Sequence, residues 1–379
     1  MGARPFRAGE FSIMNESIVN PGLGTFIFVL GGLAGAVFYL PLKREKNWAW
    51  ESYWMFYAIF ALVVSPWLLA FVKCQNVLDV LKHAPSGELW YCYLCGAAWG
   101  FGGLTWGLMI RYLGVGLGLA IGCGICSAAG TLVPKIITGK FGELLQPGAG
   151  ITSLVGVLVS IVGIVLVGLA GMSKEGELPE EAKKKAVAEY NFKKGILVAV
   201  FSGFASAGLG FGLQGGKTLE SLALQGGTAV AWKGMPVLVV CLLGGFMVNA
   251  LWCLFLNVKN KTLGDYARKD APIIPNIFWA MCAGVLWVCQ FVAFKTGEPR
   301  MGDQGYVGWA VLMASSIMFS GVLGLLLGEW KGTSAKTRGL LTAGLVVLLG
   351  SSVVAGYSGK LGQQQSSNAP APVVEKAAK

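Results

Sequence analysis

Apolar runs long enough to cross a lipid bilayer recur along the chain, separated by short polar connections. About 17–25 apolar residues span the hydrocarbon core as an α-helix. Ten runs of this kind occur, at 24–42, 53–72, 90–112, 114–134, 151–172, 195–214, 230–256, 276–295, 307–328 and 339–357. The third and fourth are divided only at 111–114, but a single helix of about 45 residues would be far too long for the bilayer. The pattern predicts an all-α polytopic membrane protein with ten transmembrane helices.

The longest charged connection, 173–194, leaves five predicted spans on each side of it. The two halves are weakly similar, because GKFGE at 139–143 precedes the fifth span and GEWKG at 328–332 precedes the tenth. Since five is odd, a repeated half must insert in the opposite orientation, an arrangement typical of secondary transporters. We therefore expect two inverted five-helix repeats.

This organisation divides the chain into five parts. We expect a polar N-terminal extension at 1–23, the first repeat at 24–172, a charged linker at 173–194, the second repeat at 195–357 and a disordered tail at 358–379. The tail is assigned from its Gln, Ser, Ala and Pro content, which cannot form a packed core.

The composition supports a lipid environment rather than water. Hydrophobic residues make up 55% of the chain and charged residues only 13%, whereas soluble domains carry about 25% charged residues. The 56 glycines allow helix backbones to approach closely, and the 13 tryptophans are typical of membrane interfaces. The composition therefore excludes an ordinary soluble globular domain.

The formal charge of +11 is distributed in short basic blocks between the apolar runs, such as 43–46 and 183–185. This distribution favours contact with the anionic lipid of a bilayer, and we expect no nucleic-acid partner. Counted over alternate connections, Lys and Arg weakly favour both termini outside.

Residues for enzymatic chemistry are not evident. The single histidine, His83, lies in a connection, and no nucleophile–base pair, paired carboxylates or phosphate loop occurs. Two Cys-x-x-Cys pairs, at 92–95 and 123–126, resemble zinc ligands. Their separation is too long for a zinc ribbon and no histidine is near, so we interpret them as small apolar residues within helices. We expect neither an enzyme, nor a cofactor, nor a metal.

Aromatic and amide side chains within the predicted spans suggest a sugar site. Trp99 and Trp106 are two helical turns apart and share a face, and aromatic rings can stack on the C–H faces of sugars. Asn249 and Gln290 cannot face hydrocarbon unpaired without a cost of several kcal/mol. Trp287 lies three residues from Gln290 and shares its face. Packing by the tryptophans and interhelical hydrogen bonding by the amides are the alternatives.

Ionisable residues occur only near the ends of the predicted spans. We expect the basic ones, including Lys295, to extend their ammonium groups towards the interface. Arg111 would stabilise the corner after the third span or contact substrate. Glu51 and Glu329 are the candidates for proton coupling, because no carboxylate lies in the middle of a span.

A set of short motifs in a particular order carries a family resemblance. They are FYLPLK at 38–43, WxWE at 48–51, PW at 66–67, AWGxG at 98–102, GLxxRYLG at 107–114, GTLxP at 130–134, NFKKG at 191–195, SAG at 206–208, WxxQ at 287–290 and EW at 329–330. Over roughly 24–356 the chain resembles the bacterial L-rhamnose–proton symporter family, within the drug/metabolite transporter superfamily. The resemblance implies ten spans, uptake of L-rhamnose or a related sugar driven by the proton gradient, and a multi-pass inner-membrane location. The superfamily usually keeps both termini cytoplasmic, against the charge count.

The leading hypothesis is a proton-coupled importer of L-rhamnose or a related monosaccharide, with its site between the halves. The candidate substrate-binding residues are Trp99, Trp106, Arg111, Asn249, Trp287 and Gln290. An exporter of metabolites or drugs is the first alternative, but such sites usually hold a deep carboxylate for a cationic substrate. A non-transporting membrane sugar sensor is the second, and would bind sugar without moving it.

Overall fold

The computed structural model describes residues 18–113, 115–177, 191–268, 270–328 and 330–368, and all regular structure in these ranges is helical. Seven segments are long and apolar enough to cross a membrane: Pro21–Leu42, Trp50–Lys73, Ala149–Gly176, Lys193–Gln225, Val230–Lys259, Ile273–Leu326 and Ala335–Gln365. The expectation of an all-helical membrane protein with many spans is therefore confirmed at this level.

The described helices follow one another along the chain in a simple order. They are α2 (Pro21–Val37), α3 (Tyr39–Leu42), α4 (Trp50–Ala58), the π-helix η1 (Ile59–Val64), α5 (Ser65–Lys73), α6 (Val77–His83), α7 (Ser86–Leu113), α8 (Val115–Ile137), α9 (Phe141–Leu144), α10 (Ala149–Gly176), α12 (Phe192–Gly215), α13 (Lys217–Gln225), the 3₁₀-helix η2 (Val230–Trp232), α14 (Met235–Lys259), the 3₁₀-helix η3 (Leu263–Ala267), α15 (Ile273–Gly297), the 3₁₀-helix η4 (Glu298–Val307), α16 (Gly308–Leu326) and α17 (Ala335–Asn368).

Local sequence explains several of these boundaries. Asn20 caps α2 by accepting a hydrogen bond from the Leu23 amide at 3.0 Å, and Asn191 caps α12 in the same way. Pro66 cannot donate to the helical ladder, and the turn before it widens into η1, so that α4, η1 and α5 form one span. α7 ends at Leu113 and α8 begins at Val115, so two helices meet at the expected corner.

Glycine pairs bring helix backbones into direct contact. A Cβ added to Gly96 of α7 would lie 1.8 Å from the Cys241 carbonyl oxygen of α14, and one added to Gly244 of α14 would lie 1.9 Å from the Tyr93 carbonyl oxygen. These two contacts leave no space for any side chain larger than hydrogen. The close approach of helices expected from the glycine content is thus realised where α7 and α14 cross.

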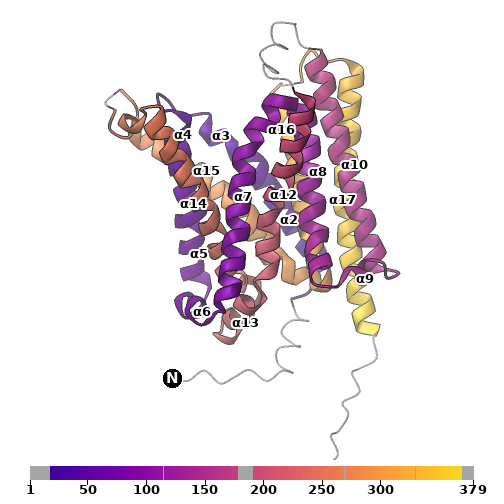
Figure 1. The fold of residues 1–379 in the computed structure, drawn as a ribbon. Helices are drawn as coiled ribbons and strands as arrows, with labels where there is room; N and C mark the ends of the chain where they lie inside the picture. The colour runs from indigo at the N-terminus through magenta and orange to yellow at the C-terminus, as the bar shows by residue number, and fades with distance from the viewer. Residues whose placement is uncertain (1–17, 114, 178–190, 269, 329, 369–379) are drawn as a thin grey trace, which may run out of the picture.

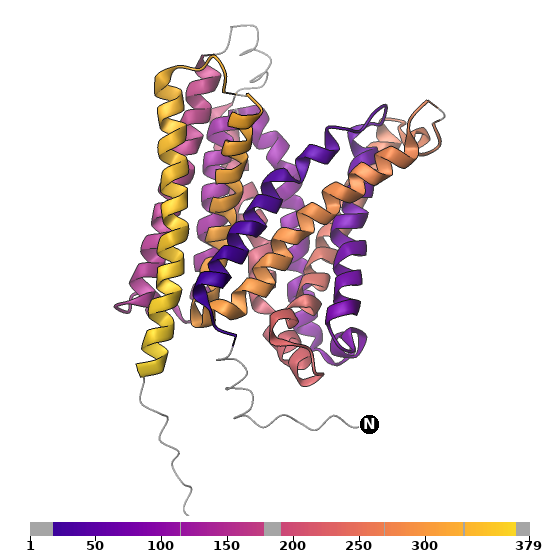
Figure 2. The ribbon, with the colours of Figure 1, turned by 180° about the vertical axis from the view of Figure 1, so that it is seen from behind.

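The helices form one bundle in which α10 and α17 lie side by side at one edge (Figure 1). α12 packs against α7 and α8, and α2 packs against α15 and α16, as seen from behind in Figure 2. We call the end of the bundle that holds α6, α9 and α13 the α13 end, and the opposite end, which holds α3 and η3, the α3 end (Figure 1).

The described part of the chain begins and ends at the α13 end, with α2 and α17 (Figure 1). α17 continues to Asn368, so residues 358–368, which we had expected to be a disordered tail, are helical. Gln365 explains part of this extension, because its amide accepts from the Ala149 amide at 3.2 Å and donates to the Pro147 carbonyl oxygen at 2.9 Å. Residues 369–379, the rest of the expected tail, lie outside the described ranges.

Candidate substrate site

An aromatic cluster joins helices from the two halves of the chain. The rings of Trp99 on α7 and Trp287 on α15 lie 5.2 Å apart between centroids. Tyr57 of α4 meets Trp287 edge-on at 6.3 Å, and Phe291 lies 4.6 Å from the same ring. Trp287 is buried and Trp99 is half-buried. The sequence predicted both tryptophans as site residues, and the structure places them in contact.

Two glycines make the aromatic cluster possible. A Cβ at Gly245 of α14 would lie 2.6 Å from the Trp99 ring. The indole therefore occupies the space that a side chain at position 245 would fill. A Cβ at Gly284 of α15 would lie 2.8 Å from the Ala61 amide nitrogen, which shows how closely α15 approaches the π-helical segment η1. This approach brings Trp287 to Tyr57.

Asn249 supports the cluster by hydrogen bonding. Its side-chain oxygen accepts from the Trp54 indole nitrogen at 3.1 Å, and its side-chain nitrogen donates to the Gly245 carbonyl oxygen at 2.9 Å. Trp54 in turn packs on Tyr57, with ring centroids 4.6 Å apart. The buried amide therefore orients an aromatic residue beside the site.

Gln290 lies one turn beyond Trp287 on α15, at a point where α2 and α16 converge. A Cβ at Gly35 of α2 would lie 2.7 Å from the Gln290 side-chain oxygen and 2.7 Å from the Ser316 hydroxyl. The hydroxyls of Ser315 and Ser316 are buried and make no hydrogen bond within the described residues. Buried polar groups normally have partners, so these hydroxyls are available to a bound polar molecule.

Trp106 occupies a different interface from Trp99. Its indole nitrogen donates to the Ser206 hydroxyl of α12 at 2.8 Å, and its ring lies 3.4 Å from the position of a Cβ on Gly122 of α8. One residue earlier, the hydroxyls of Thr105 and Ser202 lie 2.6 Å apart. Trp106 thus connects α7 to α8 and α12, two turns from the Trp99–Trp287 pair.

Glu51 is buried near the α3 end, in a polar network at the start of α4. Its carboxylate accepts from the Asn260 amide at 2.9 Å and from the Thr262 hydroxyl at 2.8 Å. Asp265 nearby accepts from the Ala49 amide and the Ser52 hydroxyl, both at 2.8 Å. The network ties α4 to the connection after α14. Glu329 and the side chain of Arg111, the two other predicted site groups, lie outside the described part of the structure.

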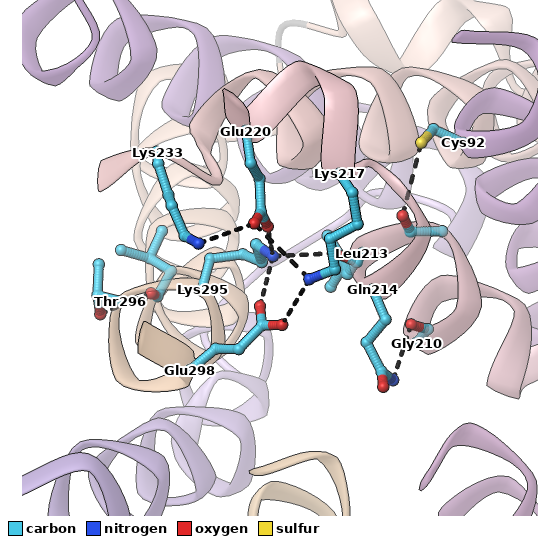
Figure 3. Close-up of polar contacts among 12 residues, drawn as sticks. Cys92, Gly210, Leu213, Gln214, Lys217, Glu220, Lys233, Lys295, Thr296 and Glu298 are labelled. Carbon is cyan, nitrogen blue, oxygen red and sulfur yellow. Dashed lines mark hydrogen bonds and ion pairs between the residues drawn. The ribbon is translucent and has the colours of Figure 1, made fainter. Parts of the chain in front are cut away.

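An ion-pair network that the sequence did not predict lies at the α13 end (Figure 3). The Lys295 ammonium is buried at the end of α15 and donates to Glu220 of α13, to Glu298 at 2.5 Å and to the Leu213 carbonyl oxygen at 2.9 Å. The expectation that Lys295 extends towards the interface is therefore wrong. The reason is that α13 folds back against the bundle and supplies a buried carboxylate.

Two further lysines complete the network. Lys233 lies 3.1 Å from the second oxygen of Glu220, and Lys217 lies 3.2 Å from Glu298 (Figure 3). The sequence held one local signal, because Lys217 and Glu220, like Lys295 and Glu298, are three residues apart just after an apolar run. The pairing of Glu220 with Lys295 needs the tertiary fold. We call these five residues the Lys295 network.

Comparison with known proteins identifies the chain. A family model described as L-rhamnose-proton symport protein (RhaT) matches residues 14–359. L-rhamnose-proton symporters from Mannheimia succiniciproducens and Pectobacterium carotovorum are each 32% identical over 337 residues, which cover 88% of this chain and 96% of each relative. An L-rhamnose-proton symporter from Yersinia pestis is 31% identical over 346 residues, 90% of this chain and 98% of the relative. The chain therefore belongs to the L-rhamnose-proton symport protein family.

Proposed function

We propose that this protein is a secondary active transporter that imports L-rhamnose, or a closely related sugar, together with a proton across a bacterial inner membrane. The observation that carries the proposal is the match, over nearly the whole of both chains, to relatives named for that activity. The aromatic cluster supports the proposal together with the nearby Ser315 and Ser316 hydroxyls, which form no hydrogen bond with the described residues, because sugar sites combine apolar rings with a few polar groups.

We propose further that the chain crosses the membrane ten times. The segment Ile273–Leu326 contains α15 and α16, which are separated by η4, where Gly302 has non-helical angles (φ 57°, ψ −133°). Dividing this segment and adding α7 and α8 raises the seven apolar segments to ten. An even number also agrees with α2 beginning and α17 ending at the same end of the bundle (Figure 1).

The packing of the helices supports two inverted repeats. α12 contacts α7 and α8 as α2 contacts α15 and α16, and α8 contacts α10 as α16 contacts α17. α7 packs on α14, and α15 packs on the span formed by α4, η1 and α5. Exchanging the first five spans for the last five therefore reproduces these contacts, as two copies of one fold require.

The sugar is proposed to bind at the interface between the repeats. Trp99 and Trp287 would stack on its C–H faces, while Gln290 and the Ser315 and Ser316 hydroxyls would hydrogen-bond its hydroxyl groups. Asn249 and Trp106 would hold neighbouring helices in place, and Arg111 remains a candidate contact at the end of α7. Rocking of the repeats about this site would expose it to each side in turn.

The test is uptake of labelled L-rhamnose into proteoliposomes, with and without an imposed inward proton gradient. Stimulation by the gradient that an uncoupler abolishes supports symport. Gln290→Ala should weaken rhamnose affinity about fivefold, because it removes a hydrogen bond worth about 1 kcal/mol, while leaving the bundle folded. No uptake or exchange of rhamnose by folded wild-type protein would refute the substrate assignment, and an unchanged affinity would remove Gln290 from the site.

A further inference from the structure

Glu45 lies in the connection between α3 and α4, at the α3 end. Both of its carboxylate oxygens are buried, and neither has a hydrogen-bond partner within the described ranges. The connection itself is fixed against α15, because the Lys46 amide donates to the Asn276 side chain at 3.1 Å and the Asn276 amide donates to the Lys46 carbonyl oxygen at 2.8 Å. The carboxylate of Glu45 is therefore held in place without a compensating donor.

An unpaired buried carboxylate is costly as an anion and binds a proton instead. Burial raises the pKa of Glu45 from its ordinary value of 4.5 to about 8. The basic residues of its own connection, Lys43, Arg44 and Lys46, are exposed, and Arg44 lies over the Trp279 ring. A neutral carboxyl group at this position is therefore expected at neutral pH.

Glu45 is connected to the candidate sugar site through one face of α4. The Tyr53 hydroxyl is close enough to interact electrostatically with Glu45 and with Tyr39. Tyr57 lies four residues from Tyr53, on the same face of the helix, and contacts Trp287 of the aromatic cluster. Movement of α4 would therefore act on the carboxyl group and on the sugar site together.

The α13 end shows what a compensated carboxylate looks like in this fold. Glu220 lies in the connection between the first two spans of the second half, as Glu45 does in the first half. Glu220 is buried beside Lys295 and Lys233, and so can remain ionised. No lysine or arginine of the described ranges donates a hydrogen bond to Glu45 in this conformation, so a proton takes that place.

We propose that Glu45 binds the transported proton and must be neutral before the α3 end closes over the sugar. The inference rests on the proposed sugar–proton symport. The proton passes from water at the α3 end to a Glu45 oxygen, moves along the face of α4 past the Tyr53 hydroxyl towards the sugar site, and reaches water on the opposite side from that site after the repeats rock; no bond of the sugar changes. Glu51, whose carboxylate is already hydrogen-bonded by Asn260 and Thr262, then has a structural role.

The test compares Glu45→Gln with wild type in proteoliposomes. Glutamine keeps the shape of the neutral acid but cannot release a proton. We expect labelled L-rhamnose to exchange across the membrane at equal internal and external sugar, while accumulation driven by a proton gradient and rhamnose-induced acidification of the lumen are lost. Asp79→Asn, which alters an exposed carboxylate on α6, should leave both activities unchanged.

If Glu45→Gln accumulates rhamnose under a proton gradient as well as wild type does, the assignment of the proton to Glu45 is wrong, while the proposed function still stands. Absence of rhamnose exchange by the wild type would instead refute the proposed function, so the two failures are distinguishable. If Glu45→Gln does not fold, Glu45→Asp serves in its place and should keep proton coupling with a shifted pH midpoint. Infrared spectra of wild type should also show a protonated carboxyl band that is lost near pH 8, and a band that does not titrate there would contradict the assignment.

Discussion

Gly245 controls, as a single residue, whether Trp99 can reach Trp287. Gly245→Ala places a methyl group 2.6 Å from the indole ring of Trp99, which must move. Overpacking of this kind costs about 1–3 kcal/mol, and we expect rhamnose affinity to fall about tenfold. Binding can be measured by calorimetry. Gly103→Ala on α7, where nothing lies within 4 Å of the new methyl group, is the matched control and should bind as wild type.

The buried Glu45 carboxyl group should also make the free energy of unfolding depend on pH. Because its pKa is raised from 4.5 to about 8 by burial, the folded state binds a proton that the unfolded chain releases. The stability that this proton contributes is complete below pH 4.5 and is lost as pH rises to about 8. Thermal unfolding in detergent should show this decline for wild type and a flatter profile for Glu45→Gln. An identical slope in both proteins would place the titration elsewhere.

Some site residues could be predicted from the sequence and others could not. Trp99 and Trp287 were predicted because an aromatic residue inside an apolar run is visible in the sequence, and their ring contact is now observed. Glu45 was hidden in the basic block at 43–46, which has the pattern of an ordinary topology signal. Its burial follows from packing of the connection against α15, which no local pattern encodes.

At the scale of the element, α13 is a short helix held to the bundle by the Lys295 network, in which the pair of Glu220 with Lys295 is the most buried. Lys295→Met would leave Glu220 buried with its principal partner gone, and loss of one member of a buried pair costs about 3–5 kcal/mol. We expect a lower thermal unfolding temperature in detergent. The double variant Lys295→Met with Glu220→Leu should recover part of the loss, because the buried Glu220 carboxylate is removed together with its partner while Glu298 keeps Lys217.

A matched control for this pair lies at the same end of the bundle. Lys140 and Glu143 are exposed and 3.9 Å apart, so Lys140→Met should change stability by about 0–1 kcal/mol. Equal effects of Lys295→Met and Lys140→Met would show that the buried pair does not hold α13.

Element boundaries were predictable where local chemistry sets them and less so elsewhere. The start of α12 follows from Asn191, which caps it, and the break between α7 and α8 follows from the limit on helix length. The extension of α17 to Asn368 was missed, because its polar sequence resembles a solvated tail. Contacts of Gln365 with the connection before α10 hold it, and these are tertiary.

At the scale of the whole molecule, the class of fold could be predicted and the packing could not. Apolar run lengths indicate spans, because the bilayer imposes one length on every helix. Which helices touch depends on steric fit at small residues such as Gly96 and Gly244, whose partners lie far away in the sequence. The pairing of α12 with α7, and of α2 with α15, became visible only in three dimensions.

The asymmetry between the two ends of the bundle leads to a last prediction. The Lys295 network lies within the second half of the chain and ties α13 to the end of α15, so an opening of the α13 end that moves α15 away from α13 requires these ion pairs to separate. Glu220→Gln removes one charge from the network without changing its volume, so we expect the population to shift towards an open α13 end.

Cys92 and Cys241 are buried near this end, beside Gly212 of α12. Both should react faster with a membrane-impermeant maleimide in Glu220→Gln than in wild type, as measured by peptide-resolved mass spectrometry. Lys140→Met should leave the rates unchanged. If Glu220→Gln also leaves them unchanged, the network is a fixed part of the scaffold, and opening of the α13 end must depend on other contacts.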